Sequence, residues 1–141
     1  MTDATERVIR ISAAVIVDAA GRALVVRKRG TTAFMQPGGK IDAGETPAEA
    51  VCREVYEELG TAVSHADIRP LGRHRAEAAN EPGHHVEADL FSVTLRDEPR
   101  PTAEIEEIAW IDPAAPGDIE LAPLTRDTVL DLVRRAAQRS G

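Results

Sequence analysis

The sequence predicts a layered α/β domain. Strand-like apolar segments lie on both sides of one strongly marked helix, and a second amphipathic helix closes the chain. The 141 residues are enough for one sizeable core, and no change in composition marks a linker. We therefore expect a single domain over residues 1–141, with residues 1–7 disordered.

Charge and cysteine usage exclude several classes of protein. A formal net charge of -7 argues against a surface for nucleic-acid polymers, and no apolar run is long enough to span a membrane. Residues 1–7 lack the apolar segment of a signal peptide, and the lone Cys52 cannot form an intrachain disulfide. These features predict a soluble, cytoplasmic protein with Cys52 in the core.

The first half of the chain begins with two predicted strands. Val8–Val17 is rich in Val, Ile and Ala, and Ala23–Val26 is a second apolar run. The segment Asp18–Gly21 between them has the composition of a turn. These three segments predict a β-hairpin.

Signals at both ends define the central helix. Thr46 is a suitable N-cap, Pro47 fits the first helical position, and Glu49 completes a capping box. Gly60 supplies a left-handed residue at the C-terminus. One apolar stripe faces the core. It comprises Ala48, Val51, Cys52, Val55 and Leu59.

A second stripe of this helix is acidic. Glu54, Glu57 and Glu58 lie three and four residues apart, where like charges repel by about 0.2–0.5 kcal/mol per pair. Arg53 offsets part of this repulsion. A solvated acidic face is one interpretation. The adjoining Gly38–Gly39 pair allows close approach of a ligand, and clustered carboxylates suit a hard divalent cation, so a metal site is the better interpretation.

The acidic helix and its loop resemble the signature of the Nudix hydrolases, which here covers residues 39–61. Thr61 stands where the family usually has an aliphatic residue, and we expect its methyl group to pack in the core. The matching positions are Gly39, Glu45, Arg53, Glu54, Val55, Glu57, Glu58 and Gly60.

The resemblance implies a Nudix-type α/β/α sandwich with a mixed curved sheet. It also implies cleavage of a nucleoside diphosphate linked to another group, by water attack on phosphorus with Mg²⁺ or Mn²⁺ as cofactor. By position, the metal ligands would be Glu54, Glu57 and Glu58, with the Gly38 carbonyl nearby.

Further roles follow from the same resemblance and from charge. By position in the signature, Glu45 and Arg53 would support the loop and helix of the catalytic site, and Lys40 could touch phosphate. Basic residues at Arg27 and Arg29 could also bind phosphate oxygens, with a solvated strand end as the alternative.

The second half of the chain predicts more strands. Val63–Ile68 and Leu71–Ala79 are weak strand candidates, and Val86–Leu95 is a stronger one that is buried on both faces towards its end. A turn at Asn80–Gly83 separates the last two. His84 and the histidine after it lack a second pair of zinc ligands, so we expect surface residues.

The last segments predict a strand at Ile108–Ile111 and an amphipathic helix at Leu124–Arg135. Water attack requires a base, and Glu104 lies at a loop end from which it could swing towards the metal. Glu54 and Glu57 are its rivals for this role, and a solvated loop is the alternative.

The resemblance leaves the substrate open. The short chain is most similar to mutator-type nucleoside triphosphate pyrophosphatases, which predicts a nucleoside triphosphate as substrate and a monophosphate and pyrophosphate as products. Those enzymes use an asparagine before the last helix, whereas Asn80 is the only asparagine here. Alternatives are hydrolysis of ADP-ribose or dinucleoside polyphosphates, or ligand binding by a non-catalytic regulator. A homodimer also stays open.

Overall fold

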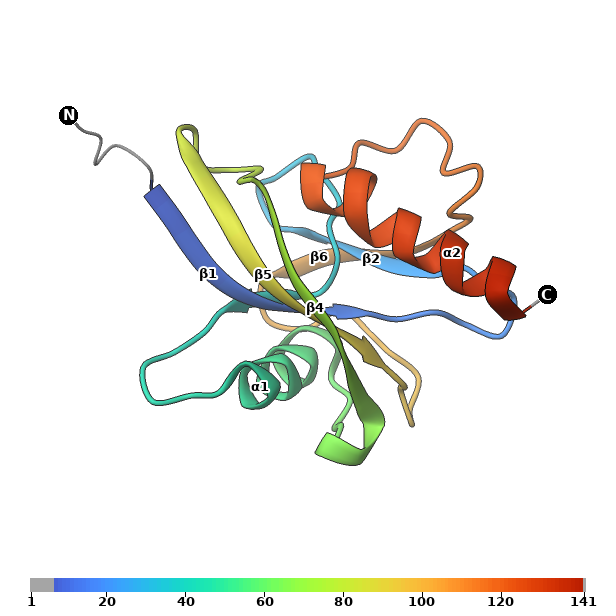
Figure 1. Cartoon of the computed structure of the whole chain (residues 1–141), viewed down its shortest axis with the longest axis horizontal. Helices are drawn as coiled ribbons and strands as arrows, with labels where there is room; N and C mark the ends of the chain where they lie inside the picture. The colour runs from blue at the N-terminus through green and yellow to red at the C-terminus, as the bar shows by residue number, and fades with distance from the viewer. Residues whose placement is uncertain (1–6, 141) are drawn as a thin grey trace.

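A computed structural model describes residues 7–140 as three layers, with α1 on one side of the strands and α2 on the other (Figure 1). This arrangement confirms the predicted α/β/α sandwich. Residues 1–6 lie outside the described part, but Arg7 already belongs to a strand, contrary to the prediction of disorder through residue 7. The elements are β1 (Arg7–Val15), β2 (Ala23–Lys28), β3 (Gly38–Lys40), α1 (Pro47–Leu59), η1 (His65–Asp67), β4 (Ile68–Glu77), β5 (His84–Val93), β6 (Ile105–Ile111), η2 (Thr125–Val129) and α2 (Leu130–Ser140).

The strands form a mixed sheet with the order β3-β1-β5-β4 and a separate pair, β2-β6. β1 and β5 are parallel, with Ile11 opposite Ala88, whereas all the other pairs are antiparallel. The parallel pair requires a long connection, and α1 and β4 lie within it. The connection thereby places α1 against the N-terminal strands.

The predicted hairpin is only partly correct. Its turn forms, because Asp18 accepts hydrogen bonds from the backbone N–H groups of Ala20 and Arg22, and Val17 pairs with Ala23. Beyond this point the two strands separate. β3 and β5 occupy both edges of β1, so β2 pairs with β6 instead.

Three other elements differ from their predicted bounds. Residues 65–67 form a 3₁₀ turn capped by Ser64, so the predicted strand at 63–68 is wrong. β6 begins at Ile105, which places Glu106 and Glu107 within the strand. The last helix begins with a π-helical turn and continues to Ser140.

Two cores lie on opposite faces of the strands. Val55 and Leu59 of α1 pack with the core that contains Phe91, whereas Leu130 of α2 belongs to the core that contains Leu90. The neighbours Leu90 and Phe91 thus face opposite layers, as the alternation in β5 predicted. Residue 61 is fully buried, as expected for its methyl group. No helix within residues 7–140 is both long and apolar enough to cross a membrane.

Candidate active site

The limits of α1 agree with the sequence signals. Thr46 accepts a hydrogen bond from the backbone N–H of Glu49, the Glu49 carboxylate accepts one from the backbone N–H of Thr46, and Pro47 follows the cap. Gly60 ends the helix in the left-handed region, with a φ of 71°. These caps determine where α1 begins and ends, and therefore which acidic side chains lie on the helix.

Arg53 connects α1 to the loop that precedes it. Its guanidinium donates to both carboxylate oxygens of Glu45 at 2.6 and 3.0 Å, to the Lys40 carbonyl at 3.0 Å and to Glu54 Oε2 at 2.9 Å. Glu45 also accepts a hydrogen bond from the Asp42 backbone N–H. The Arg53 hydrogen bonds, followed by the Asp42 N–H, lower the pKa of Glu45 to about 2. The loop and the helix are therefore held in one position.

Glu58 is an acidic side chain inside the molecule. Only 2% of its surface is exposed, and its Oε1 accepts a hydrogen bond of 3.2 Å from the Gly38 backbone N–H. Burial, and then the nearby Glu54 carboxylate, raise the pKa of Glu58 to about 8. A bound divalent cation would favour the charged form that burial disfavours.

The glycine loop touches these carboxylates directly. A Cβ at Gly39 would overlap the Glu54 carboxylate and displace it, so the observed position of this carboxylate depends on glycine. A Cβ at Gly38 would collide with the backbone of β1. The three predicted metal ligands, Glu54, Glu57 and Glu58, therefore share one end of α1, next to this loop.

Their carboxylates do not converge on one point in this structure. Glu57 is half-exposed and lies 3.4 Å from Arg53, while Glu54 also contacts Arg53. Across residues 7–140, no three His, Cys, Asp or Glu side chains are arranged to hold a metal ion. The residue types suit Mg²⁺ or Mn²⁺. Metal binding by Glu54, Glu57 and Glu58 stays a prediction.

Glu104 is brought to the same end of α1 by its loop. The backbone N–H groups of Arg100 and Thr102 donate to the carbonyls of Leu59 and Glu58, each at 3.0 Å. The loop thus satisfies carbonyls that a helix end leaves without partners. Glu104 is exposed, and its carbonyl accepts a hydrogen bond from the backbone N–H of the β2–β3 loop. The candidate base is therefore near the acidic cluster but not part of it.

The predicted phosphate-binding arginines lie in ion pairs between β2 and β6. Arg27 contacts Glu107 at 3.0 Å, and Arg29 contacts Glu106 at 3.2 Å. Lys28, between them, lines a cavity instead and acts electrostatically on Glu58. A run of three basic residues does not distinguish Lys28 from its neighbours, because the pairing of β2 with β6 depends on residues far along the chain.

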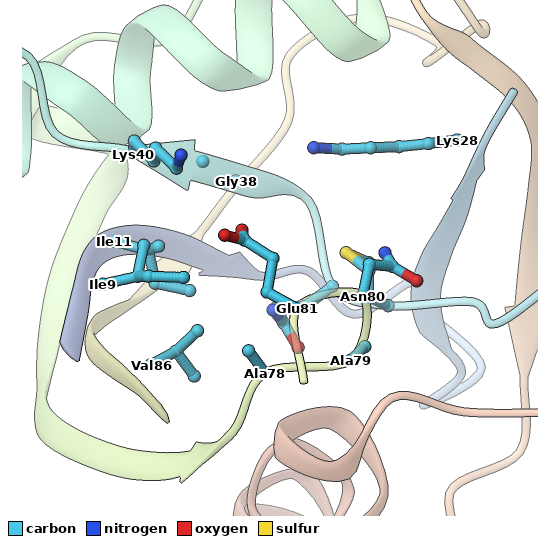
Figure 2. Close-up of a pocket in the computed structure, with 13 residues that line it drawn as sticks. Ile9, Ile11, Lys28, Gly38, Lys40, Ala78, Ala79, Asn80, Glu81 and Val86 are labelled. Carbon is cyan, nitrogen blue, oxygen red and sulfur yellow. The ribbon is translucent and has the colours of Figure 1, made fainter. Parts of the chain in front are cut away.

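This cavity has a volume of about 150 Å³ and lies between β3, β1 and the β4–β5 loop. Figure 2 shows Lys28 extending into it from β2, and Glu81 pointing towards Gly38 from the opposite side. Lys40, predicted to touch phosphate, also lines it. Asn80 and Glu81 were predicted only as turn residues, since the sequence does not show that their loop lies opposite the glycines.

Gln36 is a further cavity residue that the sequence analysis missed. It lies directly before Pro37 and is 5% exposed, a low value for an amide side chain. The available sequence signal was a single polar residue in the run 33–37, whose other members are Ala, Phe, Met and Pro.

Comparison with known proteins supports a family assignment. The model of the NUDIX domain matches residues 8–132. An 8-oxo-dGTP diphosphatase of Haemophilus influenzae is 34% identical over 67 residues, which cover 45% of this chain and 49% of that protein. An RNA pyrophosphohydrolase of Halorhodospira halophila is 44% identical over 55 residues, 39% of this chain and 29% of that protein. The matches span half or less of these two relatives.

A solved structure matches over a larger part of the chain. The MutT NUDIX hydrolase from Burkholderia pseudomallei has a TM-score of 0.74 and 28% sequence identity, covering 89% of this chain and 98% of that chain. The solution structure of the E. coli ORF135 protein covers 100% of both chains, with a TM-score of 0.73 and 21% identity. This second match shows the likeness of the fold.

Proposed function

Because this chain belongs to the Nudix family, we propose that it is a metal-dependent pyrophosphohydrolase that cleaves nucleoside triphosphates to monophosphates and pyrophosphate. One observation carries the proposal. Gly38 and Gly39 contact the carboxylates of α1 and also line the cavity, so a phosphate chain beside this loop would lie next to Glu54 and Glu58.

The proposed roles follow from the positions of the side chains. Glu54, Glu57 and Glu58, with the Gly38 carbonyl, would hold the metal. When bound, Mg²⁺ or Mn²⁺ supplies neutralisation of phosphate charge and polarises the reacting phosphoryl group. Arg53 would position Glu54 and Glu57 through its hydrogen bonds.

The remaining groups would act on the substrate and on water. Lys28 and Lys40 line the cavity as cations for phosphate oxygens. Glu104 would take a proton from the attacking water, whose oxygen forms a bond to phosphorus as the bond to the leaving pyrophosphate breaks. Arg27 and Arg29 lie in ion pairs, so phosphate contact by either one would require its release from Glu107 or Glu106.

The cavity favours a small substrate. Its volume of about 150 Å³ is below the roughly 300–1,000 Å³ of common ligand pockets, so it would enclose only part of a nucleotide. The relatives' names include both a nucleotide diphosphatase and an RNA pyrophosphohydrolase. The formal charge of -7 disfavours a polymer of phosphates, which supports the free nucleotide.

A turnover screen tests the proposal. The protein would be incubated with Mg²⁺ or Mn²⁺ and nucleoside triphosphates, ADP-ribose, dinucleoside polyphosphates or coenzyme A, with the products identified. We expect pyrophosphate and a monophosphate from a triphosphate, and turnover that is about 10³-fold slower with Glu57→Gln. Faster turnover of ADP-ribose than of every triphosphate would contradict the choice of substrate. Nucleotide binding without any turnover would indicate a regulator.

A further inference from the structure

Gln36 places an amide in the wall of the cavity. Only 5% of the residue's surface is exposed, and it lines both the cavity beside the glycines and a smaller adjoining one of about 60 Å³. The smaller cavity extends from Gln36 to Leu124, just before the last helix. The amide thus lies where the two spaces meet.

Thr125 fixes the orientation of this amide. The Thr125 hydroxyl oxygen accepts a hydrogen bond of 3.2 Å from the Gln36 backbone N–H. The hydroxyl donates its own proton to Gln36 Oε1 at 2.7 Å. Both residues are buried, so the two hydrogen bonds are shielded from water.

The amide nitrogen of Gln36 has no such partner. The hydrogen bonds found among the described residues include none from its Nε2, and this atom is not among their enclosed side-chain atoms that lack a partner, so it is open to the cavity. A ligand that covers this nitrogen must supply an acceptor, because a donor that is buried without a partner costs about 1–3 kcal/mol. The unpaired N–H groups therefore indicate where such an acceptor would bind.

The surrounding side chains suit a flat, apolar ring. Ile9, Ile11 and Val86 gather on one side of the cavity in Figure 2, and Met35 also lines it. This apolar part lies away from Lys28, which extends from the opposite side. If the phosphates lie at Gly38, the base of the nucleotide would enter the apolar part beside Gln36.

Donor chemistry then discriminates between bases. Guanine and uracil present a keto oxygen at positions where adenine and cytosine carry an amino group. The Gln36 amide NH₂ can donate to a keto oxygen but faces another donor when the base carries an amino group. We propose that Gln36, oriented by Thr125, selects nucleotides whose base presents this keto oxygen. The assignment rests on the proposed binding of nucleotides in this cavity.

Binding of uncleavable analogues tests this assignment separately from hydrolysis. The α,β-methylene analogues of GTP, ITP, ATP, UTP and CTP would be titrated by calorimetry in Mg²⁺. We expect the GTP and ITP analogues to bind about tenfold or more tightly than the ATP analogue, and the UTP analogue to bind more tightly than the CTP analogue. ITP separates the keto group from the 2-amino group of guanine.

The variants distinguish a direct role from a structural one. Gln36→Met keeps the length of the side chain but removes the donor, so both preferences should fall to within about twofold. Thr125→Val should weaken them because the amide can turn, whereas Thr125→Ser should retain them. Each preference is a ratio within one variant, so a smaller folded fraction does not change it.

The outcomes separate this inference from the proposed function. Retention of the wild-type preferences in Gln36→Met, or no keto preference in the wild type, would overturn the role of Gln36. The protein could show a keto preference that depends on Gln36 but no hydrolysis of authentic triphosphates. That result would support the role of Gln36 in binding and contradict the proposed pyrophosphohydrolase activity.

Discussion

Two charged regions of this molecule differ in how their charges are paired. Between β2 and β6, Arg27 contacts Glu107 and Arg29 contacts Glu106, one cation for each carboxylate. At the end of α1 and its loop, the single cation Arg53 contacts the four carboxylates of Asp42, Glu45, Glu54 and Glu57, while Glu58 lies buried beside them.

The difference separates a scaffold from a site. Ion pairs on an exposed surface contribute about 0–1 kcal/mol and require no ligand. An acidic cluster with too few cations is unfavourable until another positive charge arrives, and Glu58 beside Gly38 is the least solvated member. We therefore expect substitutions at α1 to change activity and matched substitutions between β2 and β6 to change little.

Glu57→Gln should have the largest effect. It removes a proposed ligand charge but nearly keeps the side-chain shape, so turnover should fall about 10³-fold while the fold survives. Relief of repulsion would change stability by only about 0.2–0.5 kcal/mol. Steady-state kinetics at limiting and saturating Mg²⁺, with circular dichroism, would measure both. Glu107→Gln is the control, and its turnover should stay within twofold of the wild type. If Glu57→Gln is as active as the wild type at both Mg²⁺ concentrations, Glu57 is not a principal ligand.

Glu104→Gln should have the next largest effect. Loss of the general base should lower turnover about 10²-fold and abolish the acidic limb of the pH–rate profile. Glu106→Gln, two residues away and paired with Arg29, is the matched control and should keep both. If Glu104→Gln keeps its rate and its acidic limb while Glu54→Gln or Glu57→Gln loses both, the base lies on α1.

The local parts of the site were predictable, whereas its long-range contacts were not. Caps and spacing predicted α1 and its acidic face. The signals at Thr46 and Gly60 could be recognised because helix caps involve residues that are close together in the chain. Lys28 and Arg29 have different surroundings because β2 pairs with β6, which lies far along the chain. Gln36 likewise gained significance only through Thr125, which is 89 residues away. The sequence contains no short-range signal for such contacts.

Two carboxylates beside Arg53 and the glycines, the buried Glu58 and the partly exposed Glu45, should respond to pH with opposite signs. Burial raises the pKa of Glu58 from 4.5 to about 8, so the native state binds this proton more tightly than the unfolded state. Without metal, this contribution to stability is present below pH 4.5 and is lost as the pH rises to 8. Glu58→Gln should therefore be about 1–3 kcal/mol more stable than the wild type at pH 8, with the difference vanishing near pH 4.5.

Urea unfolding in EDTA across this pH range would measure that difference. For Glu45→Gln, the change in the free energy of unfolding should have the opposite sign. Arg53 lowers the pKa of Glu45 from 4.5 to about 2, so its contribution is present above pH 4.5 and is lost as the pH falls towards 2. Glu45→Gln should destabilise the protein at pH 8. A Glu58→Gln variant that is less stable than the wild type at pH 8 would show that its charge is already compensated without metal.

Substitutions of Lys28 and Arg29 should have the smallest effects but give the most direct test. These two residues are neighbours in the chain, yet one belongs to the site and the other to the surface ion pairs. Lys28 lines the cavity and acts on Glu58, whereas Arg29 is 67% exposed in its side chain and contacts Glu106. Loss of one charged hydrogen bond to phosphate costs about 1.5–3 kcal/mol, so Lys28→Met should lower kcat/KM about tenfold or more. Arg29→Met removes the same charge from an ion pair on the surface and should stay within twofold. If Arg29→Met lowers kcat/KM and Lys28→Met does not, phosphate is bound by the arginine. That result would mean that Arg29 leaves Glu106 when a nucleotide binds.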